Sequence, residues 1–256
     1  MSREVAVLLL SFLCEYIDST LGMGYGTTLT PALLLLGFSP HSVVPAVLTS
    51  ELATGLVGGV LHSKAGNIKL SSRSRDTRVA LVLASCSSAG SVAAVALALS
   101  TPAAVIKLYI GLLALSMGVL MLSGYRSKTG FSWRRTVALG LLSSFNKALS
   151  GGGYGPVVVG GQLLSGIEGK RAVGTAALAE GLTCLAALAA YTALGSSRSV
   201  ASWSLTIPLT LGALASTPLA AYSVKKVEER RLEKLMGLAV SLIGIATAAK
   251  AVSSLR

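Results

Sequence analysis

The stretch "GGGYGPVVVGGQLLSGIEGKRAVGTAALAE", residues 151–180, repeats an earlier one, "GMGYGTTLTPALLLLGFSPHSVVPAVLTSE", residues 22–51. Nine of the 30 aligned positions are identical, and they include a Gly-Tyr-Gly sequence and the glutamates Glu51 and Glu180. Apolar composition alone does not produce shared residues of this kind, so we interpret the pair as an internal repeat. The two repeats are predicted to occupy residues 1–125 and 126–256.

The composition is that of a helical membrane protein, since 52% of the 256 residues are hydrophobic and only 12% are charged. A helix that crosses a bilayer needs about 20 mainly apolar residues, and many such stretches follow one another here. We expect an all-α polytopic membrane protein with about eight full crossings. Two shorter segments, the second and seventh, are predicted to be half-helices of broken or re-entrant hairpins. The ten predicted segments, five in each repeat, are residues 3–20, 25–37, 40–62, 77–99, 102–124, 132–149, 154–166, 169–194, 200–222 and 232–253.

Lysine and arginine gather in the loops after the third, fifth, seventh and ninth segments, so these loops are predicted to be cytoplasmic. The loop after the third segment is strongly basic, whereas the equivalent loop after the eighth contains only Arg198. The two repeats are therefore predicted to be inverted in the membrane. If the first two segments of each repeat form a hairpin, both termini lie outside the plasma membrane. The basic residues of the four loops are Lys64, Lys69, Arg73, Arg75 and Arg78; Arg126, Lys128, Arg134 and Arg135; Lys170 and Arg171; and Lys225, Lys226, Arg230, Arg231 and Lys234.

The duplicated glycine sequences predict a site for an anion. Inverted repeats with broken helices are typical of secondary transporters, which bind their substrate between the repeats. A helix that starts after an unwound Gly-Tyr-Gly sequence presents free backbone N–H groups and the positive end of its dipole, and both favour an anion. The candidate substrate-binding residues are Gly24, Tyr25, Gly26, Thr27, Thr28, Lys147, Gly153, Tyr154, Gly155 and Gln162.

Other interpretations of the glycines were weighed. Glycine also lets membrane helices pack closely, which is the preferred explanation for Gly55-x-x-x-Gly59. A dinucleotide-binding fingerprint is excluded because no strand precedes either glycine run.

Ionisable residues inside the predicted segments are costly and need an explanation. Asp18 and Lys147 occupy equivalent positions, so we expect either that they pair or that Lys147 binds substrate. Glu51 and Glu180 are also equivalent. They are expected either to cap the exposed N–H groups of the glycine breaks or to carry coupled protons.

Two pairs of motifs carry a family resemblance: "GYGTTLTPALLLLGFSP" with "HSKAGNI" in the first half, and "SGGGYGPVVVGGQLLSG" with "KRAVGTAALAE" in the second. They resemble the duplicated motif of the TauE/SafE family of membrane permeases, also called the sulfite exporter or 4-toluene sulfonate uptake permease family. The resemblance covers nearly the whole chain and implies transport of sulfur oxyanions or organosulfonates such as sulfite. The chain departs from the family pattern where Tyr25 interrupts the first glycine run and where Gly160 replaces the equivalent of Pro31.

The sequence thus predicts a secondary transporter of a small anion, with a passive anion channel as the alternative. An intramembrane enzyme is disfavoured because no His-Glu-x-x-His or Gly-x-Ser-Gly motif is present. No cofactor or metal is expected, since the three cysteines lack metal-ligand spacing. The net charge of +12 lies in loops and is explained by membrane topology, so no nucleic-acid partner is expected. The expected partners are the anion, the lipid bilayer and, in one arrangement, a second copy of the chain.

Overall fold

The computed structural model describes residues 3–123, 130–195, 202–223 and 229–254. This part of the chain is entirely helical, and each of the ten predicted segments corresponds to one helix. The predicted repeat boundary, Arg198, Arg126, Lys128, Lys225 and Lys226 lie outside the described residues. The helices are α1 (Arg3–Leu21), α2 (Tyr25–Leu35), α3 (Pro40–Lys64), α4 (Arg75–Ser100), α5 (Ala103–Ser123), α6 (Trp133–Ser150), α7 (Tyr154–Leu164), α8 (Gly169–Leu194), α9 (Trp203–Ser223) and α10 (Glu229–Ser253).

Six of these helices are long and apolar enough to cross a membrane: α3, α4, α5, α8, α9 and, from Lys234 on, α10. The sequence-based expectation of about eight is not reached among the described residues. Helices α2 and α7 have 11 residues each and so span about 16 Å, half of a hydrocarbon core. Helix α1 carries Arg3, Glu4, Glu15 and Asp18, a polar content that sets it apart from the six. The structure is that of a multi-pass membrane protein.

Helices α1 and α2 form a hairpin. Arg3, at the start of α1, donates a hydrogen bond from Nη2 to the carbonyl oxygen of Leu36 at 2.8 Å, just beyond the end of α2. The Arg3 guanidinium also lies 4.3 Å from the centre of the Phe38 ring. At the tip, Gly22 and Gly24 have φ angles of 71° and 138°, which glycine adopts far more readily than other residues. The glycine break therefore turns the chain back on itself.

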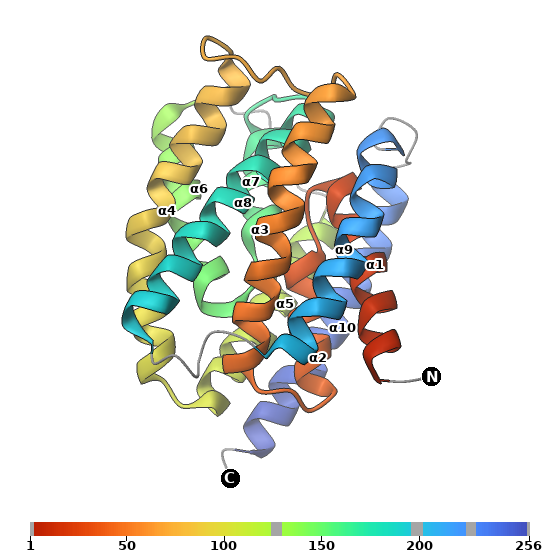
Figure 1. Ribbon diagram of the computed structural model, residues 1–256, viewed down its shortest axis with the longest axis vertical. Helices are drawn as coiled ribbons and strands as arrows, with labels where there is room; N and C mark the ends of the chain where they lie inside the picture. The colour runs from red at the N-terminus through yellow and green to blue at the C-terminus, as the bar shows by residue number, and fades with distance from the viewer. Residues whose placement is uncertain (1–2, 124–129, 196–201, 224–228, 255–256) are drawn as a thin grey trace.

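Helices α6 and α7 form a second hairpin, which opens toward the opposite end of the molecule. Its tip contains Gly151 and Gly153, with φ angles of 73° and 76°. Phe131, just before α6, and Ser165, just after α7, line one cavity together with Arg75 at the start of α4. The first hairpin opens where α3 begins, and the second opens where α3 leads into α4. In Figure 1 the connection between α3 and α4 lies at the top and α10 ends at the bottom.

The crossing helices surround the two hairpins. Helix α3 packs along α8 and α9, α4 along α6 and α8, α1 along α9, and α5 along α10. Where α3 crosses α8, a Cβ atom on Gly55 would lie 2.7 Å from the backbone nitrogen of Gly181. Only glycine permits this approach, so Gly55 is a packing residue.

The outer surface is apolar. Leu211, Leu219 and Trp203 of α9 are more than half exposed, as are large apolar side chains on other helices. Lipid tails solvate such side chains, whereas water does not. The buried apolar residues form two clusters, one containing Tyr25 and the other Tyr154.

Candidate functional site

The tips of the two hairpins cross in the interior of the protein, with backbone against backbone. A Cβ atom on Gly152 would lie 2.8 Å from the carbonyl group of Gly26, and a Cβ on Gly26 would overlap the carbonyl oxygen of Gly151. A Cβ on Gly155 would overlap the carbonyl oxygen of Gly22. Each tip therefore needs glycine because the other tip occupies the space of a side chain.

Hydrogen bonds fix the two tips. The backbone N–H of Gly153 donates to Thr27 Oγ1 at 3.0 Å, which joins the start of α7 to the start of α2. The N–H of Tyr25 donates to Asp18 Oδ1 at 3.1 Å. Asp18 therefore caps α2, a role that the sequence assigned to Glu51 and Glu180. The first turn of α7 contains Pro156, which has no N–H, so this helix offers fewer donors than its glycine run suggests.

The space at the crossing is small. A cavity lined by Gly26, Thr27, Gly152 and Gly153 has a volume of about 10 Å³, enough for about one water molecule. The hydroxyl group of Thr28 is buried nearby in α2 and has no hydrogen-bond partner in the structure. The tips are thus in contact and leave no room for an anion in this conformation.

The two repeated tyrosines are fully buried. The Tyr25 hydroxyl forms hydrogen bonds with Ser11 Oγ at 2.9 Å and with Ser50 Oγ at 2.8 Å. Ser11 in turn donates to the carbonyl oxygen of Leu209 at 2.6 Å. Tyr25 therefore ties the first tip to α1, α3 and α9 and does not face the small cavity. Tyr154, its counterpart, is part of the apolar cluster that includes Val158 and Val159.

Lys147, at the end of α6, is held by two carboxylates. Its Nζ lies 2.7 Å from Glu180 Oε1 of α8 and also pairs with Glu51 Oε2 of α3. Lys147 is 1% exposed and Glu51 is 3% exposed, so these charges are removed from solvent. The pairing differs from the expected contact with Asp18, and it also differs from a free ammonium poised for substrate. The close approach of α3 and α8 at Gly55 and Gly181 brings the two glutamates to one lysine.

Further carboxyl groups lie close to this pair. Glu15, whose Oε1 accepts a hydrogen bond from Ser19 Oγ at 2.7 Å, is 3% exposed and lies within electrostatic range of Glu51 and Glu180. Asp18 lies within range of Glu180 as well. Among the described residues, these four carboxyl groups face one ammonium, that of Lys147. Sequence reasoning missed Glu15 because it has no counterpart at the equivalent position, Ser144.

Gln162 does not lie at the hairpin tips. It is eight residues beyond Tyr154 in α7, which corresponds to about 12 Å along the helix. Its Oε1 accepts a hydrogen bond from Thr175 Oγ1 at 2.8 Å, and it lines a cavity at the opposite end of α7. The prediction that Gln162 adds to the site between the glycine breaks is therefore wrong in this conformation, because a short helix separates them.

The chain was compared with known proteins. The family model described as "Sulfite exporter TauE/SafE" matches residues 7–247. The chain is 28% identical to the "Probable membrane transporter protein YtnM" of Bacillus subtilis (strain 168) over 258 aligned positions, which cover 96% of this chain and 83% of that protein. No solved structure matches.

Proposed function

The chain belongs to the sulfite exporter TauE/SafE family of membrane transporters, and we propose that it is a secondary transporter of a small anion. The proposed substrates are sulfur oxyanions and organosulfonates, of which sulfite is the smallest considered. The substrate is bound between the two glycine breaks. The observation that carries this proposal is the direct crossing of two helix starts in the interior, beside a buried lysine.

We propose further that residues 1–125 and 126–256 are inverted repeats. At an offset of 129 residues, α1 to α5 correspond to α6 to α10. The packing of α1 on α9 then corresponds to that of α6 on α4, and α3 on α9 corresponds to α8 on α4. The two hairpins open toward opposite ends of the molecule, as inversion requires. This arrangement gives three crossings and one re-entrant hairpin in each repeat.

The proposed orientation places both termini outside the cell membrane. The basic residues Arg75 and Arg171 lie together at the end where α3 leads into α4, and the positive-inside rule assigns this end to the cytoplasm. Lys250, near the end of α10, donates to the carbonyl oxygen of Leu35 at 3.0 Å, which places it at the end where α1 begins. The two termini therefore share the end opposite the basic cavity.

A carrier is favoured over a passive channel by the volume at the crossing. About 10 Å³ between the tips is far too small for a sulfonate, so a substrate enters only when the hairpins move apart. Secondary transporters move one part of the protein against another around the substrate, whereas a channel needs an open path.

The carboxyl groups around Lys147 suggest how the anion is loaded. Four buried carboxylates with one ammonium would carry a net charge of −3, which would repel an anion at the adjacent glycine breaks. Protonation of these groups removes the repulsion, so protons and anion are proposed to bind together. Glu51 and Glu180 are the proposed proton carriers, because their carboxylates alternate as partners of Lys147.

The proposal is tested by flux in proteoliposomes that contain the purified protein. We expect saturable uptake of labelled sulfite and counterflow against unlabelled sulfite inside. Gly153→Leu, which fills the space beside Leu113 and Asn146, and Lys147→Ala should each lower the flux strongly. Undiminished flux in both variants would contradict the proposed site, and conductance without saturation or counterflow would favour the channel.

A further inference from the structure

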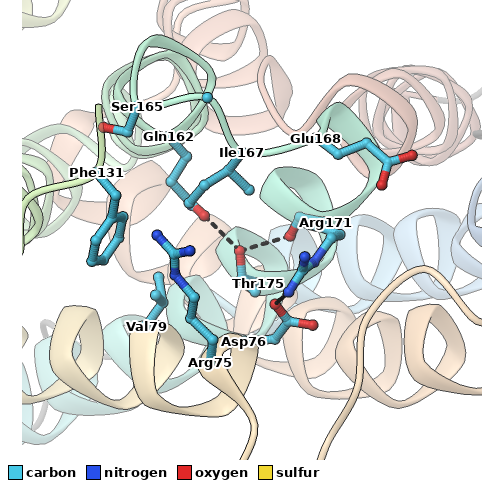
Figure 2. Close-up of a pocket in the computed structure, with 11 residues that line it drawn as sticks. Arg75, Asp76, Val79, Phe131, Gln162, Ser165, Ile167, Glu168, Arg171 and Thr175 are labelled. Atoms are coloured by element: carbon cyan, nitrogen blue, oxygen red, sulfur yellow. Dashed lines mark hydrogen bonds and ion pairs between the residues drawn. The ribbon is translucent and has the colours of Figure 1, made fainter. Parts of the chain in front are cut away.

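A second polar cavity lies at the end of α7 that is remote from the glycine breaks. It has a volume of about 380 Å³, within the range of small-molecule sites, which extends from roughly 300 to 1,000 Å³. Three stretches that are far apart in the sequence line it: the start of α4, the residues before α6, and the connection from α7 to α8 (Figure 2). The positive-inside rule assigns all three to the cytoplasmic end.

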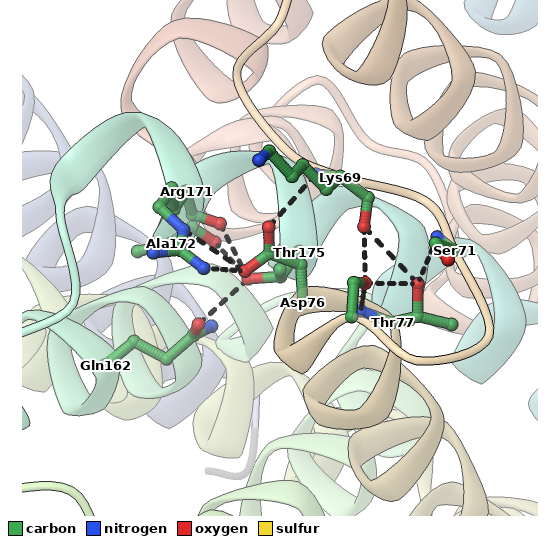
Figure 3. A network of polar contacts seen from close by, with 9 residues as sticks. Lys69, Ser71, Asp76, Thr77, Gln162, Arg171, Ala172 and Thr175 are labelled. Carbon is green, nitrogen blue, oxygen red and sulfur yellow. Dashed lines mark hydrogen bonds and ion pairs between the residues drawn. The ribbon is translucent and has the colours of Figure 1, made fainter.

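One acidic side chain in the cavity wall is already neutralised. Asp76 Oδ1 accepts hydrogen bonds from Arg171 Nε at 3.1 Å and Nη2 at 2.6 Å, while Oδ2 accepts one from the backbone N–H of Lys69 at 3.0 Å (Figure 3). Asp76 is 5% exposed, so its charge is directed at these partners and not at the cavity. The pair fixes the wall of the cavity and contributes no net charge.

Arg75 leaves a positive charge in the cavity. Its guanidinium lies 3.9 Å from the centre of the Phe131 ring, and in the described part of the chain it pairs with no carboxylate. In Figure 2 it points into the middle of the cavity, between Phe131 and Thr175. Glu168 points away from it and pairs with Lys170 at 2.8 Å. The formal charge of the lining residues and their ion-pair partners is therefore +1.

A buried amide faces the same space. Gln162 is 4% exposed, and the hydrogen bond from Thr175 to its Oε1 fixes the orientation of the amide. Its Nε2 is buried and has no hydrogen-bond partner in the structure. A buried donor without a partner costs about 1–3 kcal/mol, and an oxygen atom of a ligand would satisfy it.

We propose that this cavity is a second anion-binding site, which takes a sulfur oxyanion or a small sulfonate from the cytoplasm. The planar guanidinium of Arg75 matches two oxygen atoms of such an anion, and the Gln162 amide donates to a third. Helix α8 leads from Thr175 to Glu180 over five residues, or about 7.5 Å, so the cavity lies about two helical turns from the central ion pair. The second site rests on the proposed function and adds a station on the cytoplasmic side of the central one.

The chain contains its own reporter for this site. Trp133 contacts the Phe131 ring edge to face, with centroids 4.9 Å apart, and Arg75 covers the same ring. The protein has two tryptophans, and the other, Trp203, is 66% exposed at the start of α9. Trp203→Phe therefore leaves Trp133 as the single fluorophore. An anion that engages Arg75 changes the surroundings of Phe131 and, through it, the emission of Trp133.

The experiment titrates the purified Trp203→Phe protein with sodium sulfite and, separately, sodium thiosulfate, at constant ionic strength set with chloride. We expect a saturable change in Trp133 emission that chloride does not produce. Arg75→Gln and Gln162→Leu should each raise the apparent Kd about tenfold or more, because each removes a donor to the anion. Arg78→Gln is the matched control, since Arg78 is an exposed arginine of the same helix that does not line the cavity.

A response that is unchanged in Arg75→Gln and Gln162→Leu, or no saturable response in the parent protein, would overturn the second site. If Arg75→Gln does not fold, Gln162→Leu decides. Flux measured on the same proteins separates this outcome from failure of the proposed function. Flux without a Trp133 response refutes the cavity site and leaves transport standing, whereas a Trp133 response without flux refutes transport and leaves the cavity site standing.

Discussion

Lys147 Nζ lies 2.7 Å from Glu180 Oε1 in the interior of the protein, where neither group reaches solvent freely. The lysine ends α6 beside the second glycine break, and the glutamate is in the middle of α8. A conformational change that moves the second hairpin against α8 must stretch or replace this contact. The pair therefore links the position of the hairpin to the charge state of the carboxyl groups.

Replacing Lys147 by methionine should destabilise the protein. Removal of one partner of a buried ion pair leaves uncompensated charge and costs about 3–5 kcal/mol. The free energy of unfolding of the purified protein in detergent, measured by titration with denaturant, checks this. Lys64→Met, a change of an exposed lysine, should lie within about 0.5 kcal/mol of the parent.

A second substitution tests the cause of this loss. Glu180→Gln in the Lys147→Met protein removes one of the stranded carboxylates and should recover part of the stability. If the double variant is less stable than Lys147→Met by the full effect of Glu180→Gln alone, the two residues are not coupled and the ion pair is not the cause.

Gly26→Ala should disrupt the crossing of the tips. Its methyl group overlaps the carbonyl oxygen of Gly151, and overpacking against backbone costs about 1–3 kcal/mol or more. We expect a lower yield of monodisperse protein and a lower Tm. Gly160→Ala is the control, because a Cβ at Gly160 of α7 meets nothing within 4 Å and alanine favours a helix by about 0.5–1 kcal/mol. Equal Tm values for the two variants would mean that the tips do not touch.

Asp18→Ala should weaken the start of α2. The variant loses the acceptor for the N–H of Tyr25, and loss of such a cap costs about 0.5–2 kcal/mol. Asp18→Asn keeps an acceptor oxygen and removes the charge, so the difference between the two variants isolates the cap. Unfolding measurements should rank Asn above Ala. The reverse order would show that removal of negative charge matters more here than the hydrogen bond.

These residues also show how far the sequence could lead. The ten helices were predicted from apolar segments and glycine breaks, because hydropathy and glycine act locally. The partner of Lys147 was not predicted. Equivalence in the repeat suggested Asp18, but the free N–H of Tyr25 is only seven residues from Asp18 and binds its carboxylate. The long side chain of Lys147 reaches Glu51 and Glu180, which are brought together by a helix crossing that no local pattern encodes.

The cavity at the end of α7 was beyond prediction for a similar reason. Asp76 and Arg171 are 95 residues apart in the sequence, and each looked like part of a solvated, basic loop. The single signal was an acidic residue, Asp76, in a loop that otherwise carries only lysine and arginine. Gln162 was assigned to the wrong end of α7, because nearness in sequence to Tyr154 was taken as nearness in space.

Glu180→Gln should separate proton coupling from anion exchange. The neutral side chain no longer takes up a proton, so uptake driven by a pH gradient should fall about tenfold or more, which is about 1.4 kcal/mol of coupling, while counterflow is retained. Both are measured in the same proteoliposomes. Glu4→Gln, a change of an exposed carboxylate in α1, should leave both intact. Equal loss of uptake and counterflow would assign Glu180 to anion binding and not to protons.

The contact of Gly26 with Gly151 and Gly152 also constrains how the protein is made. The first hairpin is synthesised more than a hundred residues before the second, and until then its tip has no backbone partner inside the bilayer. The first half therefore waits, with part of its polar backbone unsatisfied, for the second half to be inserted. Assembly of the two halves is the last step of biogenesis, and a chain truncated between them has no folded state of its own to reach.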